Sequence, residues 1–246
     1  MSEKRVLVTG SSRGIGRAIA ARLAKDGWTV AVHGSQMSAE LDSIAAEVGA
    51  EKAYMARLDG RPGADKLIDQ VLADGPLHAL VNNAGIYEQA EFTRSSDDEF
   101  ERVFEQMFKV NFESPVWLAR RACKHFLDRG AGGRVLNIAS RVGHRGEANA
   151  SAYSAAKAAL INMTRALAVE HAMRKIAHFA LAPGWVDTSM SRDGMEDRLP
   201  SILESIPLGR MATPEDCAGA ASYLLSGEAD YLSGVVLDIN GASYLR

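Results

Sequence analysis

Short apolar runs rich in β-branched residues alternate with longer amphipathic segments along the whole chain. The apolar runs predict seven strands, at residues 5–8, 29–32, 53–57, 77–81, 134–138, 176–181 and 235–238. Between them, patterns with helical periodicity begin near residues 14, 39, 63, 97, 115, 152 and 214. Strands that alternate with helices are typical of βαβ units. The sequence therefore predicts an α/β fold, with a doubly wound, parallel, seven-stranded sheet and helices on both faces.

The chain shows no internal division. No stretch rich in Pro, Gly or Ser, no block of like charge and no repeat separates one part from another. We therefore expect residues 1–246 to form one Rossmann-like domain. Ligands of such sheets bind outside the carboxyl ends of the strands, where the strand order reverses. Polar motifs that directly follow a predicted strand are thus the candidates for a site.

Composition narrows the class of protein. Hydrophobic residues make up 47% of the chain and charged residues 24%, as in an ordinary soluble globular protein. The net charge of −3 gives no electrostatic footprint for nucleic acid or for an anionic membrane. The predicted first strand starts within five residues of Met1, and no apolar run approaches the roughly 20 residues of a membrane span. We expect a soluble, cytoplasmic protein.

The cysteines and histidines show no pattern of a metal centre. The two cysteines, Cys123 and Cys217, are far apart and form no CxxC pair, which fits a reducing compartment and predicts two buried thiols. The 6 histidines contain no HExxH motif and no other ligand spacing. We therefore expect no catalytic metal.

Three glycines lie where the first predicted strand turns into the first helix, in the sequence Thr9-Gly-Ser-Ser-Arg-Gly-Ile-Gly16. Glycine lets the backbone turn tightly, approach a phosphate closely and pack a helix against a strand. The free amides at the start of that helix then favour an anion. The loop predicts a site for the pyrophosphate of a dinucleotide.

The end of the second strand indicates which dinucleotide is preferred. An NAD-selective site carries an acidic residue there that binds the ribose hydroxyls. Here the strand ends in Val32-His-Gly-Ser-Gln36, without an acid. Arg13 in the glycine loop can pair with a 2′-phosphate, and Ser35 can donate a hydrogen bond to it. These residues favour NADP(H) over NAD(H), although Arg13 could also be a solvated loop charge.

A candidate acid–base centre begins at Tyr153, which is followed by Lys157 one helical turn later. Residues at i and i+4 share a helix face, and a nearby cation favours phenolate, so Lys157 is expected to lower the pKa of Tyr153. Ser140 supplies a neutral hydroxyl after the fifth strand. The YxxxK spacing is common by chance, so its meaning depends on the rest of the chain.

The chain resembles the short-chain dehydrogenase/reductase family over nearly its whole length. The family's motifs occur in the expected order as TGxxxGxG at residues 9–16, NNAG at 82–85, a helix Asn at 111, Ser140, YxxxK at 153–157 and Pro-Gly at 183–184. The segments around Pro207, Thr213 and Tyr231 also look like those of the family. Six motifs in order are specific, and they give the Tyr153 spacing its meaning.

The resemblance implies a role for each matching residue. Tyr153 would protonate a ketone oxygen during hydride transfer, and Ser140 would orient that oxygen. Lys157 would hold the nicotinamide ribose and lower the Tyr153 pKa. Asn111 would support a proton-relay water. Asn83 would brace the sheet. The implied cofactor contacts, taken together with those of the glycine loop, are Gly10, Ser12, Arg13, Gly14, Ile15, Gly16, Ser35, Asp59, Asn82, Ala84, Gly85, Tyr153, Lys157, Pro183, Gly184, Val186 and Thr188.

The substrate is the least determined part. Ser140, Val142, Trp185 and Met190 are the candidate contacts. Residues 141–151 and 185–200 are expected to form the substrate wall and lid, with Met195 in an apolar lid. The chain looks most similar to 3-oxoacyl-acyl-carrier-protein reductases. This resemblance implies that it reduces a 3-oxoacyl thioester in fatty acid biosynthesis and forms a homotetramer. It also implies an acidic carrier protein as partner, which basic residues such as Arg129 and Arg174 would contact. An alcohol, polyol or sugar dehydrogenase is the alternative. The complete set of four catalytic residues argues against a non-catalytic dinucleotide sensor.

Overall fold

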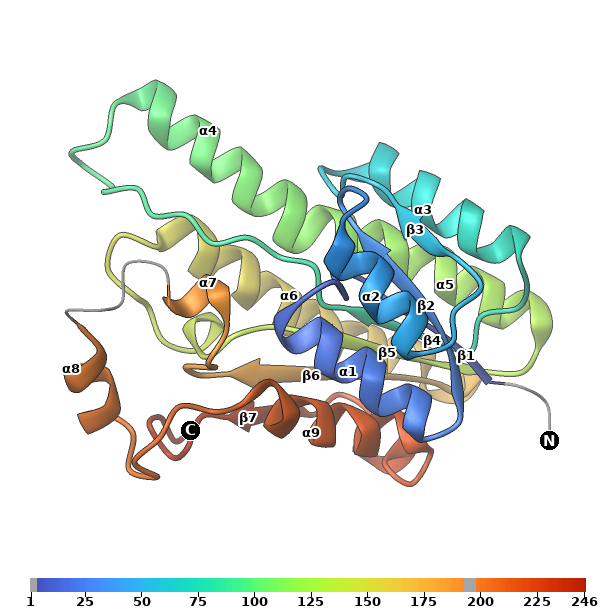
Figure 1. Ribbon diagram of the computed structural model, residues 1–246. Helices are drawn as coiled ribbons and strands as arrows, with labels where there is room; N and C mark the ends of the chain where they lie inside the picture. Colours follow the sequence, from blue (N-terminus) through green and yellow to red (C-terminus); the bar gives the residue numbers. More distant parts are fainter. Residues whose placement is uncertain (1–3, 193–197) are drawn as a thin grey trace.

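The computed structural model describes residues 4–192 and 198–246, and in them one parallel sheet runs through the molecule (Figure 1). The seven strands lie in the order β3-β2-β1-β4-β5-β6-β7. Their bounds are β1 Lys4–Val8, β2 Trp28–Gly34, β3 Ala53–Met55, β4 Ala79–Asn82, β5 Gly133–Ile138, β6 Ile176–Pro183 and β7 Val236–Ile239. The chain first builds outward from β1 and then returns to the other side of β1 with β4. This reversal between β1 and β4 is the place where a doubly wound sheet binds its ligand, and it confirms the predicted fold class.

Helices cover both faces of the sheet. One hydrophobic cluster joins β-strand residues to α1 Gly14–Lys25, α2 Ala39–Glu47 and α9 Pro214–Ser226, and a second joins the opposite face to α3 Arg61–Ala73 and α5 Ser114–Arg129. In β1, Val6 and Val8 belong to the first cluster while Leu7 belongs to the second. Side chains of a strand alternate between the faces, so a strand that is buried on both sides reads as an unbroken apolar run.

The remaining helices build the edge that carries the candidate motifs. Helix α4 Asp97–Phe108 extends away from the sheet and continues through a π-helical turn, Lys109–Glu113, into α5 (Figure 1). Helix α6 Ser151–His171 packs beside α4 and the π-helical turn. The short helices α7 Ser189–Arg192 and α8 Leu199–Glu204 follow β6. Short helical turns lie at Arg141–Gly143, Ala172–Arg174 and Asp230–Leu232.

Two strands are shorter than the apolar pattern predicts. Strand β3 ends at Met55 instead of Arg57, and β4 begins at Ala79 instead of Leu77. The amide of Leu77 donates to His125 Nε2 at 3.1 Å, so a side chain replaces the ladder there. Because β3 is an edge strand with one neighbour, its pairing with β2 stops after three residues.

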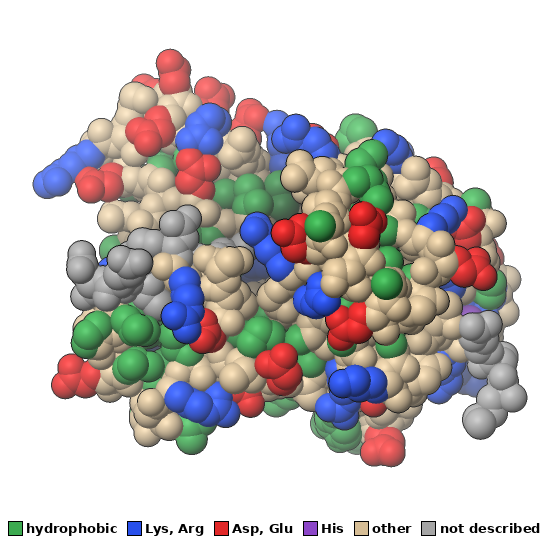
Figure 2. Space-filling model, in the orientation of Figure 1, with side chains coloured by type: hydrophobic (Ala, Val, Ile, Leu, Met, Phe, Trp, Pro, Cys, Tyr) green, Lys and Arg blue, Asp and Glu red, His purple; other side chains and the backbone are tan. Residues whose placement is uncertain are grey.

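Charged side chains of both signs are interspersed over the visible face (Figure 2). In the described part of the chain, no helix has both the length and the apolar character that are needed to cross a membrane.

Candidate active site

The glycine loop has the conformation that its sequence predicts. Gly10 has φ +63°, and a Cβ added there would lie 2.9 Å from Ala84 Cα. A Cβ at Gly16 would lie 2.3 Å from both the Gly10 carbonyl oxygen and Asn83 Nδ2. Real side chains do not approach backbone so closely, so only glycine allows α1 to start this near the sheet. Helix α1 also has no side-chain cap and no acidic residue in its first turn. Its free amides therefore suit an anion.

Neighbouring strands hold this loop through hydrogen bonds. His33 Nδ1 accepts from the Gly10 amide at 3.1 Å, and His33 Nε2 lies 3.0 Å from the Ala56 carbonyl oxygen. Burial lowers the pKa of His33 to about 4, so the ring is neutral at physiological pH and carries its proton on Nε2. Thr9 Oγ1 accepts from the amides of Asn83 and Ala84 at 2.9 and 3.0 Å. Sequence reasoning missed His33 and Thr9, because their partners lie 23 or more residues away.

The two asparagines at the end of β4 both hold neighbouring parts of the chain together. Asn82 was expected to line the adenosine side, but its side chain is buried and donates to Asn137 Oδ1 at 2.9 Å and to the Pro115 carbonyl at 3.3 Å. Asn83 Nδ2 donates to the carbonyls of Thr9 and Gly10 at 2.8 and 3.0 Å, so it ties the segment after β4 to the end of β1, in agreement with the bracing role that the resemblance implies. The two side chains differ because of the strand alternation: Asn82 closes β4 and faces the interior, while Asn83 turns toward the glycine loop.

The far end of the glycine loop is open to solvent. Arg13 and Ser35 are exposed, and the Arg13 guanidinium forms no hydrogen bond or ion pair with any other residue that the structure describes. Asp59 is also exposed and lies 3.9 Å from Arg57 Nε. Because β3 ends at Met55 and α3 begins at Arg61, Asp59 lies in the loop between these two elements.

A π-helical turn positions Asn111. This residue is fully buried, its Nδ2 donates to the Ile86 carbonyl at 3.0 Å, and its Oδ1 accepts from the Ile86 amide at 3.1 Å. A Cβ at Gly85 would lie 2.8 Å from Asn111 Oδ1 and 3.6 Å from Lys157 Nζ. The turn therefore brings the segment after β4 against α6. Single π-helical turns of this kind frequently mark functional sites, and no sequence pattern predicted this one.

Ser140, Tyr153 and Lys157 meet beyond the end of β5. Ser140 begins the turn after that strand and hydrogen-bonds the phenol of Tyr153. Lys157 is buried and donates to the Ile138 carbonyl at 2.9 Å, and its Nζ lies 5.7 Å from the centre of the Tyr153 ring. The arrangement brings together a phenol, a hydroxyl and an amine from two different elements, as the sequence predicts.

The pKa of Tyr153 moves opposite to the expected direction. Desolvation by the surrounding protein raises it to about 12, and the hydrogen bond from Ser140 opposes this only in part. Burial also lowers the pKa of Lys157 to about 8. The prediction that Lys157 makes the phenol more acidic is therefore wrong for this structure, because the removal of water outweighs a cation whose nitrogen bonds Ile138. At neutral pH the phenol keeps its proton and is a proton donor.

The segment after β6 returns to the glycine loop. Pro183 ends the strand, and the Gly184 amide donates to the Ile239 carbonyl at 2.8 Å. Val186 is buried and pairs with Ala212. A Cβ at Gly14 would lie 3.3 Å from Thr188 Cγ2, so the start of α1 and the segment after β6 face each other.

The predicted substrate contacts Val142 and Trp185 follow β5 and β6, respectively. Val142 is buried, and Trp185 packs against Ile202, Ile206 and Met211 near α8. Met190 lies in α7 but its side chain is not described, and Met195 lies outside the described residues.

Three polar residues lie near them; Arg141 and Glu147 belong to the segment 141–151 that was predicted as a substrate wall, whereas sequence reasoning missed Tyr87. Tyr87 packs edge-on against Tyr153 with ring centres 5.1 Å apart and donates to Glu147 Oε1 at 3.2 Å. Arg141 stacks on Trp185 at 4.9 Å and lies 3.5 Å from Glu147.

The two arginines considered for a carrier protein lie away from this subunit's Tyr153. Arg129 ends α5 and donates to the Leu77 carbonyl at 2.7 Å, so it braces the start of β4. Arg174 follows the carboxyl end of α6, whereas Tyr153 lies in its first turn. Both arginines therefore lie away from Tyr153 in this chain, and contact with a carrier protein stays a prediction.

Comparison with known proteins agrees with this geometry. The family model of the short chain dehydrogenases matches residues 4–199. The chain belongs to this family. It is 36% identical to the 3-oxoacyl-[acyl-carrier-protein] reductase FabG of Aggregatibacter actinomycetemcomitans, over 98% of this chain and 99% of that protein.

Two solved structures bear on the cofactor and substrate. A protein inferred to be an NAD(P)-dependent gluconate 5-dehydrogenase from Beutenbergia cavernae, with bound NADP at low occupancy, superimposes with TM-score 0.89 and 35% identity, covering 98% of this chain and 96% of that one. The 3-ketoacyl-(acyl-carrier-protein) reductase of Brucella melitensis, complexed with NADH, gives TM-score 0.88 and 31% identity, with 98% of each chain covered. The protein is thus a nicotinamide-dinucleotide oxidoreductase, and its relatives act on both acyl and sugar-derived substrates.

Proposed function

We propose that this dehydrogenase reduces a ketone to a secondary alcohol with NADPH and that Tyr153 is the proton donor. The observation that carries the proposal is the protonated phenol beside the Ser140 hydroxyl, at the edge of the sheet where the glycine loop also lies. Positioned acid–base catalysis typically contributes about 10² to 10⁴ in rate. Bound NADPH would supply the hydride.

The protein's own groups account for the proton. Ser140 would donate a hydrogen bond to the substrate oxygen and hold it beside Tyr153. As the new C–H bond forms, the Tyr153 proton would move to that oxygen, which leaves an alcohol and a phenolate. Lys157, kept in place by the Ile138 carbonyl, would stabilise the phenolate and return a proton to it.

Asn111 would act mainly by positioning. Both polar atoms of its side chain already bond the backbone of Ile86. A relay water next to Lys157 would therefore be held by backbone atoms of the π-helical turn, while the Asn111 side chain fixes Gly85 against the site.

The preference for NADPH rests on the exposed end of the glycine loop. Arg13 has a free guanidinium, Ser35 a nearby hydroxyl, and no acidic residue ends β2. We expect Arg13→Ala to raise the KM for NADPH at least about tenfold, since hydrogen bonds to charged groups contribute about 1.5–3 kcal/mol, and to change the KM for NADH little. Initial rates with both cofactors test this, with Arg17→Ala as the control because Arg17 pairs with Glu47. An equal rise for both cofactors would contradict the assignment.

A 3-oxoacyl thioester is the substrate class we propose. Support comes from the apolar wall of Val142 and of Trp185 with its neighbours Ile202 and Met211, and from the relation to acyl reductases. The test is NADPH oxidation with acetoacetyl-CoA as the model substrate. Turnover of acetoacetyl-CoA well above that of small ketones supports an acyl substrate. If acetoacetyl-CoA is not turned over and a keto-sugar acid is, the proposal of an acyl substrate is overturned.

A sugar or polyol substrate is the second candidate, favoured by the polar group of Arg141, Glu147 and Tyr87 beside Tyr153. A guanidinium at this position would suit a carboxylate or vicinal hydroxyls. If this candidate holds, Arg141→Met should lower kcat/KM for a keto-sugar acid about 10-fold or more, because a hydrogen bond to a charged group is lost. The same variant should leave acetoacetyl-CoA reduction almost unchanged.

A further inference from the structure

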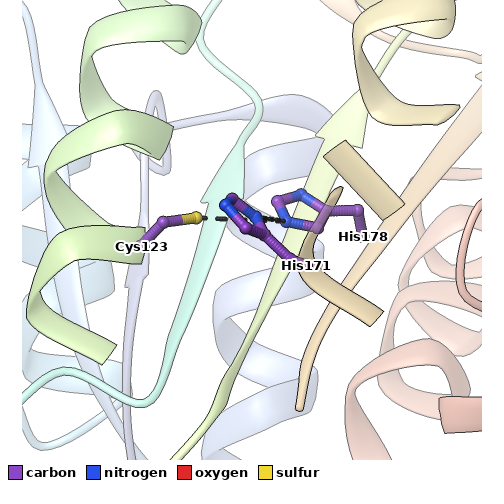
Figure 3. A group of neighbouring side chains, drawn as sticks. All are labelled: Cys123, His171 and His178. Carbon is purple, nitrogen blue, oxygen red and sulfur yellow. Dashed lines mark hydrogen bonds between the residues drawn. The ribbon is translucent and has the colours of Figure 1, made fainter. Parts of the chain in front are cut away.

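Three buried side chains with metal-binding atoms meet at the end of the sheet opposite to Tyr153. Cys123 comes from α5, His171 is the last residue of α6, and His178 lies near the start of β6 (Figure 3). His171 Nδ1 lies 3.0 Å from His178 Nε2, Cys123 Sγ lies 4.0 Å from the same nitrogen, and all three atoms lie within 4.8 Å of one another. No function assigned above uses them.

The cluster is enclosed by protein. The exposed fractions are 4% for Cys123, 6% for His171 and 0% for His178. His178 Nδ1 is buried and has no hydrogen-bond partner among the described residues. Burial lowers the pKa of both imidazoles, so both rings are neutral and each keeps a lone pair for a cation.

We propose that Cys123 Sγ, His171 Nδ1 and His178 Nε2 bind one Zn²⁺-class ion. A tetrahedral zinc centre has Zn–N bonds of about 2.0–2.1 Å and a Zn–S bond of about 2.3 Å, which place two nitrogens about 3.3 Å apart and a nitrogen and a sulfur about 3.6 Å apart. The widest pair must therefore close by about 1 Å at most. Thiolate and imidazole together are typical zinc ligands, and they do not suit Mg²⁺ or Ca²⁺.

Binding has a simple proton balance. The Cys123 thiol would lose its proton to solvent as the S–Zn bond forms, and both rings would bind as neutral ligands. His171 Nε2 lies 3.6 Å from Glu170 Oε1, so Glu170 can accept from the ring's outer N–H after a small rotation. A carboxylate behind a metal-bound histidine orients the ring and strengthens binding. The fourth position would be taken by water.

The position of the cluster indicates a structural ion. His171 follows Tyr153 by 18 residues along the same helix, which is about 27 Å at 1.5 Å per residue. An ion there cannot touch the reacting oxygen. It would join α5, α6 and β6 at the end of the sheet away from the catalytic residues, and it would stabilise the folded chain because the unfolded chain cannot present the same three ligands.

The test uses the full-length protein after treatment with a chelator. Titration with Co²⁺ as a spectroscopic probe should give one tetrahedral ion per chain with a sulfur-to-cobalt charge-transfer band, and one equivalent of Zn²⁺ should abolish the band and raise the Tm. Cys123→Ser should lose the charge-transfer band, and His178→Asn should weaken Zn²⁺ binding at least about 100-fold, because loss of an inner ligand exceeds the roughly 10- to 100-fold effect of an outer one.

Cys217→Ser is the matched control, since Cys217 is also a free, buried cysteine but lies in α9. It should keep both the band and the Zn²⁺-induced rise in Tm. The wild-type titration alone can overturn the proposal, whatever happens to the folding of the variants. No binding at one equivalent, or a band that persists in Cys123→Ser, would show that the three side chains are only a hydrogen-bonded cluster.

Discussion

Lys157 shows how strongly burial acts on a single residue of this site. An ammonium group that is almost inaccessible to water has lost most of its hydration, and among the described residues it donates a hydrogen bond to the Ile138 carbonyl. Its pKa is therefore lowered to about 8. The site keeps a charged lysine at neutral pH, but at a cost to the stability of the fold.

This cost gives a prediction for the pH dependence of stability. The unfolded chain holds the Lys157 proton up to its ordinary pKa of about 10.5, whereas the folded chain releases it near pH 8. Between these values the unfolded state binds more protons, so this group's contribution to the free energy of unfolding rises with pH. The total rise is about 3 kcal/mol, at about 1.4 kcal/mol per pKa unit.

Urea unfolding of the wild type and Lys157→Met from pH 7 to 11 measures this contribution. The difference between the two free energies of unfolding should be flat below pH 8, rise in favour of the wild type up to about pH 10.5, and then level off. Contributions from other groups cancel in the difference. A flat difference over the whole range would contradict the lowered pKa.

At the residue scale, sequence spacing predicted which residues lie together at the site but not the pKa or the burial of each side chain. The YxxxK motif placed Tyr153 beside Lys157 because a helix fixes that geometry. The direction of the Tyr153 pKa and the buried position of the Asn82 side chain depend on how the folded chain packs around each residue. Those quantities arise from tertiary packing, so sequence alone did not predict them.

At the scale of elements, the start of α9 is held by a reciprocal cap. Thr213 Oγ1 accepts from the Asp216 amide at 3.2 Å, and Asp216 Oδ2 accepts from the Thr213 amide at 2.8 Å. The ion pair with Arg210 and the cap hydrogen bonds lower the pKa of Asp216 to about 2. The neighbouring Ala212 pairs with Val186, so the cap also steadies the segment that follows β6.

We expect Thr213→Ala to destabilise the protein by about 1 kcal/mol, the usual cost of losing a threonine cap. For a chain of this size that lowers the Tm by about 2–4 °C, which differential scanning calorimetry resolves. Thr213→Ser keeps the hydroxyl and should retain the wild-type Tm within about 1 °C. An unchanged Tm for the alanine variant would show that the cap contributes nothing.

Element boundaries were predictable only where local signals set them. Helices α1 and α9 begin where the glycine motif and the Thr-Pro sequence place them. By contrast, the ends of β3 and β4 depend on neighbouring strands and on His125, and the π-helical turn at Asn111 depends on packing against α6. Such contacts join residues that are distant along the chain.

At the scale of the whole molecule, the strand order explains why the motifs converge. Because every strand is parallel, the residues after β1, β4, β5 and β6 all lie at one edge of the sheet. The alternation of strands and helices was enough to predict this edge as the site. The opposite edge carries Cys123, His171 and His178. Along the chain, His171 follows Cys123 by 48 positions and His178 follows His171 by 7. No motif joins them, so only the folded structure reveals that cluster.

The central claim is that Tyr153 delivers the proton to the substrate oxygen. The direct test compares the kcat of NADPH oxidation for the wild type and Tyr153→Phe. The substrate is acetoacetyl-CoA or a keto-sugar acid, whichever the wild type turns over faster. NADPH binding is measured separately by fluorescence. Tyr54→Phe is the control, since Tyr54 also has a pKa of about 12 but bonds Arg5 and Asp74. We predict that Tyr153→Phe loses about 10² to 10⁴ in kcat and binds NADPH normally, whereas Tyr54→Phe keeps its kcat. A Tyr153→Phe variant that retains most of its kcat would contradict the account.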